Sequence, residues 1–127
     1  MKETKELTRA ELQVMNLLWD KAEATVNELL SEYPDPKPAY NTVSTVLRVL
    51  SAKGFAGHKS AGHIHRYFPL ISREIYTDGF LTNVKRNLFK DSFAAMASFF
   101  VRKENLSNDE IEELIGLLQD SRRKEEK

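Results

Sequence analysis

The spacing of apolar residues changes twice along this sequence, and these changes restrict the folds that it can adopt. Up to residue 53, apolar side chains recur every three or four positions, which is the period of one helix face. Residues 55–68 instead show the pattern of two short strands, and the helical period returns after Pro69. The sequence therefore predicts a mainly helical α+β protein with a small β-hairpin.

Three helices are predicted before the hairpin, and their ends carry recognisable signals. The segments TRAE (8–11) and TVNE (25–28) are capping boxes, in which the Thr and Glu side chains each accept a hydrogen bond from the other residue's backbone N–H. The second helix is expected to end near the segment YPDPKP (33–38), because proline interrupts a helix. The third helix is predicted over about residues 39–53, and Gly54 follows it as a C-terminal cap.

The predicted hairpin consists of strands over about residues 55–59 and 64–68, joined by residues 60–63 (SAGH). A trio of short helices followed by a hairpin is the arrangement of a winged helix-turn-helix domain. We therefore predict such a domain over residues 1–71, with the hairpin as its wing.

Residues 72–127 predict three further helices, and a capping box, SNDE (107–110), opens the last of them. Their apolar stripes are broad, and the region is too short to bury them in a core of its own. We therefore predict a helical dimerisation region that pairs with a second copy of the chain. The residues expected in the dimer core are Phe80, Leu81, Val84, Leu88, Phe93, Met96, Phe100, Leu114, Ile115 and Leu118.

The net charge of zero hides an uneven distribution of charges. Residues 36–73 contain six Lys and Arg but no Asp or Glu, whereas residues 1–35 and 104–127 each contain eight acids and four bases. A basic surface is the electrostatic footprint of a partner that carries phosphates. The alternative interpretation is a segment that lacks acids by chance.

The predicted third helix has an unusual polar face. Its apolar side is typical of a core-facing helix, but the opposite side carries hydrogen-bonding residues and no acid. Such side chains bond to base edges and phosphates in the major groove, and Arg can contact guanine through two hydrogen bonds. The residues expected to contact bases or nearby phosphates are Asn41, Thr42, Ser44, Thr45 and Arg48. Tyr40 is expected either to join them or to pack on the proline segment. An ordinary solvated face is the alternative.

The predicted wing and nearby lysines supply positive charge for the sugar–phosphate backbone. The residues expected to contact it are Lys37, Lys53, Lys59, His63, His65 and Arg66. The wing histidines, with His58, are also the group that most resembles a metal site, but no carboxylate lies near them in the sequence. Two alternatives therefore stay open: a metal-responsive regulator that uses these histidines, and a winged helix used only for protein–protein contact.

Several other functions are not expected from this sequence. It contains no cysteine, no Ser-His-Asp order, no glycine-rich phosphate loop and no HExxH motif, so we expect neither an enzyme nor a bound cofactor or metal. No apolar run is long enough to span a membrane, and the N-terminal residues lack a signal-peptide core. A cytoplasmic protein without membrane insertion is therefore expected.

Four segments of the sequence resemble one known family of bacterial proteins. LTRAELQVMNLLWDK is similar to the family's first helix, and AYNTVSTVLRVLSAKGF is similar to its recognition helix. GHIHRYFPLISREIY resembles the wing and the start of the dimerisation helix, and FVRKENLSNDEIEELIGLL resembles the terminal segment. The family is the BlaI/MecI/CopY group of transcriptional repressors. The resemblance implies a homodimer that binds a palindromic double-stranded operator, typically built on TACA and TGTA half-sites.

The resemblance also implies two ways of induction, and the sequence departs from both. In penicillin-responsive members, a membrane sensor protease triggers cleavage at an Asn-Phe bond before the final helices. Phe99 stands where that Asn would be, which weakens the expectation of cleavage between Phe99 and Phe100. Copper-responsive members carry a C-terminal cysteine motif, which this chain lacks. A sensor protease system thus stays one candidate partner, and the sequence does not identify the inducing signal.

Overall fold

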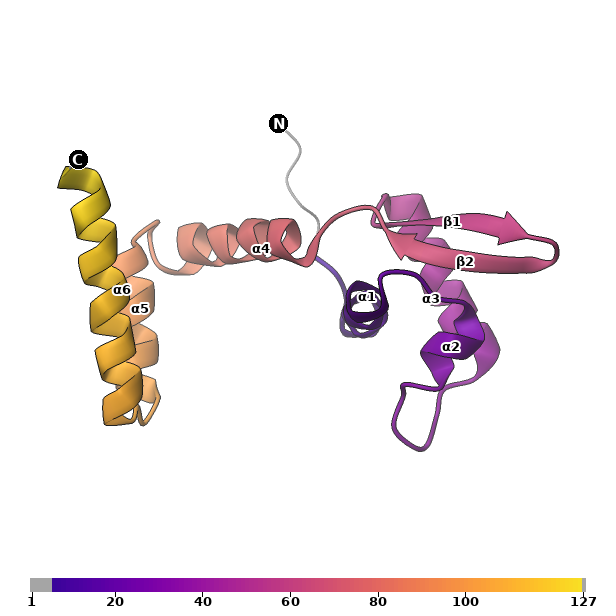
Figure 1. The fold of residues 1–127 in the computed structure, drawn as a ribbon, viewed down its shortest axis with the longest axis horizontal. Coiled ribbons are helices and arrows are strands. Elements are labelled where there is room, and N and C mark those ends of the chain that lie inside the picture. Colours follow the sequence, from indigo (N-terminus) through magenta and orange to yellow (C-terminus); the bar gives the residue numbers. More distant parts are fainter. Residues whose placement is uncertain (1–5, 127) are drawn as a thin grey trace. The chain divides into compact units, whose positions relative to one another are not determined.

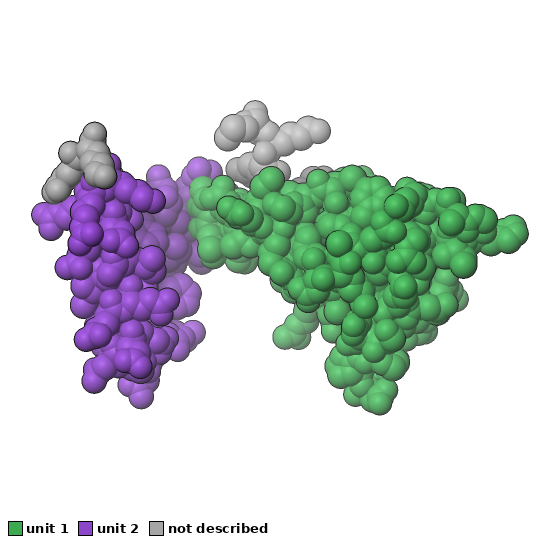
Figure 2. All heavy atoms as spheres, viewed as in Figure 1, with its two compact units in different colours: residues 1–82 green, residues 83–127 purple. Residues whose placement is uncertain are grey.

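A computed structural model describes residues 6–126, and the chain divides into two compact units, residues 1–82 and 83–127 (Figure 2). Figure 1 shows three helices followed by a hairpin and then three further helices. This order confirms the mainly helical fold with a winged helix-turn-helix domain at its start. The elements are α1 (Arg9–Lys21), α2 (Val26–Leu30), α3 (Tyr40–Lys53), β1 (Ala56–Ala61), β2 (Ile64–Pro69), α4 (Arg73–Leu88), α5 (Phe93–Lys103) and α6 (Asn108–Glu126).

The capping boxes predicted before α1 and α2 are both present. The backbone N–H of Thr8 donates to Glu11 Oε1 at 2.9 Å, and the N–H of Glu11 donates to Thr8 Oγ1 at 3.2 Å. Thr25 and Glu28 make the same pair of bonds at 2.9 and 3.1 Å. These bonds satisfy N–H groups that the first turn of a helix leaves without a partner, so they set where each helix begins.

The structure corrects two predicted boundaries. Helix α2 ends at Leu30, three residues before the predicted end near Tyr33, and turns lead from there into the prolines. The strands of the hairpin pair as far as Ala61 and Ile64, so two residues join them instead of four. Gly62 has a φ of +66°, a conformation that such tight turns require and that glycine adopts without strain.

The core of the N-terminal unit lies between α1, α2 and α3, and the base of the hairpin covers it. Phe55, Ala56 and Tyr67 close it from the hairpin side, and Tyr67 exchanges two backbone hydrogen bonds with Ala24 at 2.8 and 2.9 Å. Burial of the apolar side chains in this core makes the main contribution to the free energy that holds α3 in place. The core residues exposed by 1 % or less are Val14, Met15, Leu18, Ala24, Leu29, Val43, Leu47 and Leu50.

The first half of α4 packs on the same core. The indole N–H of Trp19 donates to the carbonyl oxygen of Ile71 at 2.8 Å, and the Tyr76 hydroxyl accepts from the N–H of Leu7 at 3.0 Å. Phe80 stacks on the Tyr76 ring at a centroid distance of 6.0 Å and is partly buried against the core. Phe80, which we expected in the dimer core, therefore has a packing partner within its own chain.

The C-terminal unit has no buried core among its described side chains. Between residues 83 and 124 every side chain is exposed or only partly buried. Leu88, Phe93 and Leu118 are more than 60 % exposed. Monomeric proteins rarely leave this many large apolar side chains in water. Within residues 6–126, each helix is also too short or too polar to cross a bilayer.

An ion pair between α1 and α3 carries a prediction about stability. The Lys53 ammonium donates to both carboxylate oxygens of Glu11, at 2.8 and 2.9 Å. Burial raises the pKa of Glu11, but its bonds with Lys53 and Thr8 outweigh this and leave the pKa below the ordinary value. A lowered folded-state pKa means that the pair stabilises the fold above about pH 4.5 and loses this effect as the pH falls through the folded-state pKa.

Replacing Glu11 by Gln should lower the free energy of unfolding by about 1–2 kcal/mol at neutral pH. Gln keeps the capping box but removes the charge that binds Lys53. Urea unfolding at about pH 7 and about pH 3 measures the effect, which should shrink in acid. Glu74→Gln, on an exposed residue of α4, is the matched control. Equal stability of the Glu11 variant and the original protein at neutral pH would show that the pair contributes nothing.

Candidate nucleic-acid interface

The outer face of α3 is polar and open to solvent. Val43, Leu47 and Leu50 are buried on the inner side and orient the helix. This burial leaves Asn41, Thr42, Thr45 and Arg48 exposed and Ser44 partly buried on the other sides. The residues that were predicted to contact bases therefore lie on the surface of α3, as base recognition requires.

Arg48 is held along the helix by a single side-chain hydrogen bond. Its Nη2 donates to Thr45 Oγ1, one helical turn earlier, at 3.1 Å. Among the described residues, no carboxylate pairs with its guanidinium. The side chain thus keeps N–H donors in the planar arrangement that binds guanine or phosphate.

A groove of about 190 Å³ separates α3 from the wing. Tyr40 and Ser44 line it from α3, and His63 and His65 line it from the hairpin. Residues that are about 20 positions apart in the sequence thereby line one groove, to which the start of α2 also contributes. Tyr40 is 51 % exposed and faces this groove, which favours a role beside the wing over packing on the proline segment.

Two histidines of the hairpin, His58 and His65, form an aromatic cluster with Tyr67. The rings of His58 and His65 lie 4.9 Å apart edge to face, and Tyr67 lies 5.6 and 6.5 Å from them. The Ser60 hydroxyl and His65 Nδ1 are 3.0 Å apart, which orients the His65 ring. No three His, Asp or Glu side chains gather as a metal site within the part of the chain that the structure describes. The geometry therefore gives the metal-responsive alternative no support.

Two basic residues of the wing are already paired with carboxylates. Arg66 Nε binds Glu23 Oε1 at 2.7 Å, Arg66 Nη2 binds Glu28 Oε1 at 3.0 Å, and Lys59 Nζ binds Glu23 Oε2 at 2.9 Å. The hydrogen bonds from Lys59 and Arg66 hold the pKa of Glu23 below its usual value. The hydrogen bond to Glu23 also raises the pKa of Arg66.

Sequence reasoning missed this network because its acids lie outside the acid-free segment 36–73. Glu23 follows α1 and Glu28 belongs to a capping box, so neither position signals contact with residues about 40 positions away. As a result, Lys59 and Arg66 are less available to phosphates than the charge count suggests.

Two further lysines of the predicted backbone contacts have structural partners. Lys37 Nζ donates to the carbonyl oxygens of Tyr33 at 2.7 Å and Leu30 at 3.2 Å, which are groups at and just beyond the end of α2. Lys53 is held by Glu11. Both residues therefore support the fold in the structure, while His63 and His65 stay exposed on the wing.

Comparison with known proteins adds independent information on the chain. The Penicillinase repressor family model matches residues 7–120. The methicillin resistance regulatory protein MecI of Staphylococcus aureus (strain N315) is 34% identical over 116 residues, which are 91% of this chain and 94% of that protein. The penicillinase repressor of Bacillus licheniformis is 27% identical over an alignment of 128 positions, which covers 98% of this chain and 100% of that protein.

Solved structures agree with these sequence matches. The solution structure of the DNA binding domain of the repressor BlaI aligns with a TM-score of 0.51 and 30% identity, covering 60% of this chain and 94% of that chain. A MarR family protein from Bacillus stearothermophilus aligns over 97% of this chain and 78% of that chain, with a TM-score of 0.55 and 16% identity, so this likeness concerns the fold alone. The chain therefore belongs to the penicillinase repressor family of DNA-binding transcriptional repressors.

Proposed function

We propose that the protein represses transcription as a homodimer, with α3 in the major groove of a palindromic operator and the wing against the sugar–phosphate backbone. The observation that carries this proposal is the exposed, acid-free face of α3. Asn41, Thr45 and Arg48 there offer amide, hydroxyl and guanidinium groups that match base edges. A cytoplasmic location is part of this proposal, because such a protein acts where the DNA is.

The wing is proposed to act mainly through its tip and its groove. His63 and His65 are exposed and face α3 across the groove, so backbone phosphates that pass between helix and wing would meet both. Arg66 and Lys59 hold the wing to Glu23 and Glu28 and would reach phosphate only by releasing these carboxylates. Arg66 is therefore assigned chiefly to positioning the wing.

Replacing Glu23 by Gln should tighten operator binding about tenfold at low salt. The change frees Lys59 for phosphate and leaves Arg66 paired with Glu28 alone. Each phosphate that a protein neutralises adds about one unit to the slope of log affinity against log salt. Fluorescence anisotropy with a labelled operator at several salt concentrations measures both quantities. Glu32→Gln is the control, because Glu32 pairs with Lys21 at 3.3 Å and makes no contact with the wing lysine or arginine. An unaltered salt slope would mean that these cations stay away from DNA.

Dimerisation is proposed to occur through the helices beyond residue 72. Ile111, Leu114, Ile115 and Leu118 follow the i, i+3, i+4, i+7 pattern on one face of α6 and are 41–64 % exposed. A second copy would cover this face and supply the core that the described part of residues 83–124 lacks. DNA binding is accordingly assigned to residues 1–71 and dimerisation to residues 72–127, although Phe80 packs on the N-terminal core.

Release by a sensor protease system stays a prediction. The bond between Phe99 and Phe100 lies inside α5, and both side chains are 49 % exposed. Helical backbone has its carbonyl and N–H groups bonded within the helix, so cleavage at this bond would require α5 to unwind. The helical conformation of α5 is thus a second obstacle to cleavage, in addition to the absence of Asn at position 99.

Fluorescence anisotropy tests the proposed function. The purified chain is titrated into a palindrome of TACA and TGTA half-sites and into a scrambled duplex, at about 50 mM and about 200 mM salt. We expect the palindrome to bind about 1,000-fold more tightly than the scrambled duplex and to weaken steeply with salt. No salt-dependent binding to either duplex would favour the rival function, a winged helix used only for protein–protein contact.

A further inference from the structure

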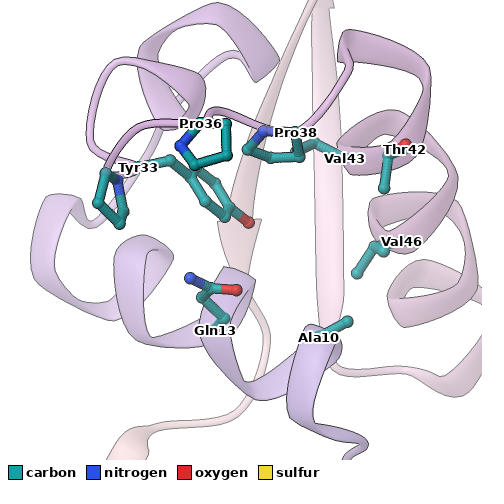
Figure 3. A pocket seen from close by; sticks show the side chains of 9 residues that line it. Ala10, Gln13, Tyr33, Pro36, Pro38, Thr42, Val43 and Val46 are labelled. Carbon is teal, nitrogen blue, oxygen red and sulfur yellow. The ribbon is translucent and has the colours of Figure 1, made fainter.

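A hollow of about 260 Å³ opens between α1, the proline segment and the start of α3 (Figure 3). Pro36 and Pro38 form one wall, Val43 and Val46 form another, and Ala10 lies on the side of α1. These apolar walls are joined by a few polar groups, which is the composition of small-molecule sites. The proposed interface with DNA does not account for this hollow.

Tyr33 is the polar group that is built most firmly into the hollow. Its side chain is 91 % buried, since the residue is 9 % exposed. Figure 3 shows its hydroxyl end turned into the hollow, between the prolines and Gln13. Within residues 6–126 the hydroxyl has no hydrogen-bond partner in the protein, and its oxygen stays accessible from the hollow. It can therefore donate a hydrogen bond to a molecule that enters the hollow.

The charge of the walls restricts what could bind. The side chains that line the hollow are neutral, and Gln13 and Thr42 add hydrogen-bonding groups beside the Tyr33 hydroxyl. A charged molecule would lose its hydration there without gaining a partner of opposite charge. A neutral molecule with an apolar body and one acceptor oxygen would lose little and would satisfy the hydroxyl.

We propose that this hollow is a binding site for a small, neutral, cyclic molecule that carries a carbonyl oxygen. The ring of the molecule packs between the prolines and Val46, and its oxygen accepts a hydrogen bond from Tyr33. The volume of about 260 Å³ is just below the range of about 300–1,000 Å³ that is typical of pockets for drug-sized ligands, so the hollow suits a smaller molecule of about ten non-hydrogen atoms.

Binding in the hollow is expected to oppose DNA binding, and this part rests on the proposed function. Thr42 lines the hollow and also belongs to the exposed face of α3. A molecule against Thr42 occupies space that DNA would approach and restrains the first turn of α3. By linkage, the molecule must weaken DNA binding by the same factor by which DNA weakens binding of the molecule.

Nuclear magnetic resonance with benzamide as the probe tests the site without DNA. Benzamide should shift the amide signals of Gln13, Thr42 and Val43 in a saturable way, with a Kd on the order of 1 mM. Benzoate and benzylamine, which have the same ring but carry a charge, should bind much more weakly. Absence of saturable shifts, or equal shifts with the charged probes, would overturn the proposal.

Two variants connect the signal to the site. Tyr33→Phe keeps the ring and should weaken benzamide binding about fivefold, because only the hydrogen bond is lost. Ala10→Leu places a larger side chain in the hollow from an exposed position on α1, so it should abolish binding. Tyr76→Phe is the matched control, since its hydroxyl bonds to Leu7 away from the hollow. Full binding by the Ala10 variant would place benzamide elsewhere and refute the site.

Operator anisotropy then separates this proposal from the proposed function. Benzamide at about ten times its Kd should weaken operator binding about tenfold, and the Ala10 variant should not respond. Saturable shifts with unchanged operator affinity would support the site and refute its coupling to DNA. Operator binding without any benzamide shifts would refute the site and leave the repressor function standing.

Discussion

Replacing Ile115 by Lys should convert the protein to a monomer and weaken operator binding by about 100-fold or more. Ile115 lies in the middle of the apolar face of α6, and it is 47 % exposed in the single chain. A Lys ammonium at this place would be buried without a partner in the dimer. Loss of the second half-site removes the gain that comes from linking two binding modules, which is typically 100-fold or more.

Sedimentation equilibrium measures the first effect and fluorescence anisotropy measures the second. The added positive charge would by itself strengthen attraction to DNA, so weaker binding cannot be an electrostatic effect. Glu113→Lys is the control, because it introduces the same residue on the opposite, exposed side of α6. A variant that stays dimeric would show that this face of α6 is not the interface.

Replacing Arg48 by Ala should cost about 1–3 kcal/mol of operator binding and should relax the preference for one base pair. Arg48 is exposed on α3, and its Nη2 donates a hydrogen bond to Thr45 Oγ1 at 3.1 Å. This bond orients the guanidinium and leaves its other N–H donors available to DNA. Arg48→Lys keeps the charge but loses the planar pair of donors, and it should recover only the nonspecific part of the affinity.

Competition assays with operators changed at one base pair at a time measure this specificity. Arg86→Ala, which removes one positive charge from an exposed position of α4, is the control and should leave base preference intact. If the Arg48 variant retains the affinity and the base preference of the original protein, Arg48 makes no base contact.

The fold was predictable to the extent that it depends on neighbours within a few positions. Capping boxes at 8–11 and 25–28 act over three residues, and the helical period repeats every three or four. The turn around Gly62 was predicted to contain four residues, but it contains two. The strands continue to pair beyond Lys59, and residue propensities alone do not reveal these pairs. The end of α2 was predicted too late because the residues before the prolines form turns with hydrogen bonds three residues back, which the position of the prolines does not reveal.

The candidate interface was predictable only in part, because sequence patterns report on neighbours within a few positions and not on distant contacts. The polar face of α3 follows from the burial of Val43, Leu47 and Leu50, which the sequence pattern already contains. The partners of Lys53 and Arg66 come from positions about 40 residues earlier, so no local pattern indicates them. A count of charges by sequence segment therefore overstates how positive the wing surface is.

Chemical-shift mapping tests the central claim most directly. The ¹⁵N-labelled protein is titrated with a duplex that carries the TACA and TGTA half-sites, and the amide signals are followed residue by residue. We predict that the largest changes fall on residues 40–48 of α3 and on residues 62–65 of the wing. Specific binding with no changes on α3 would contradict the account, because the exposed face of that helix would then have no role in reading DNA.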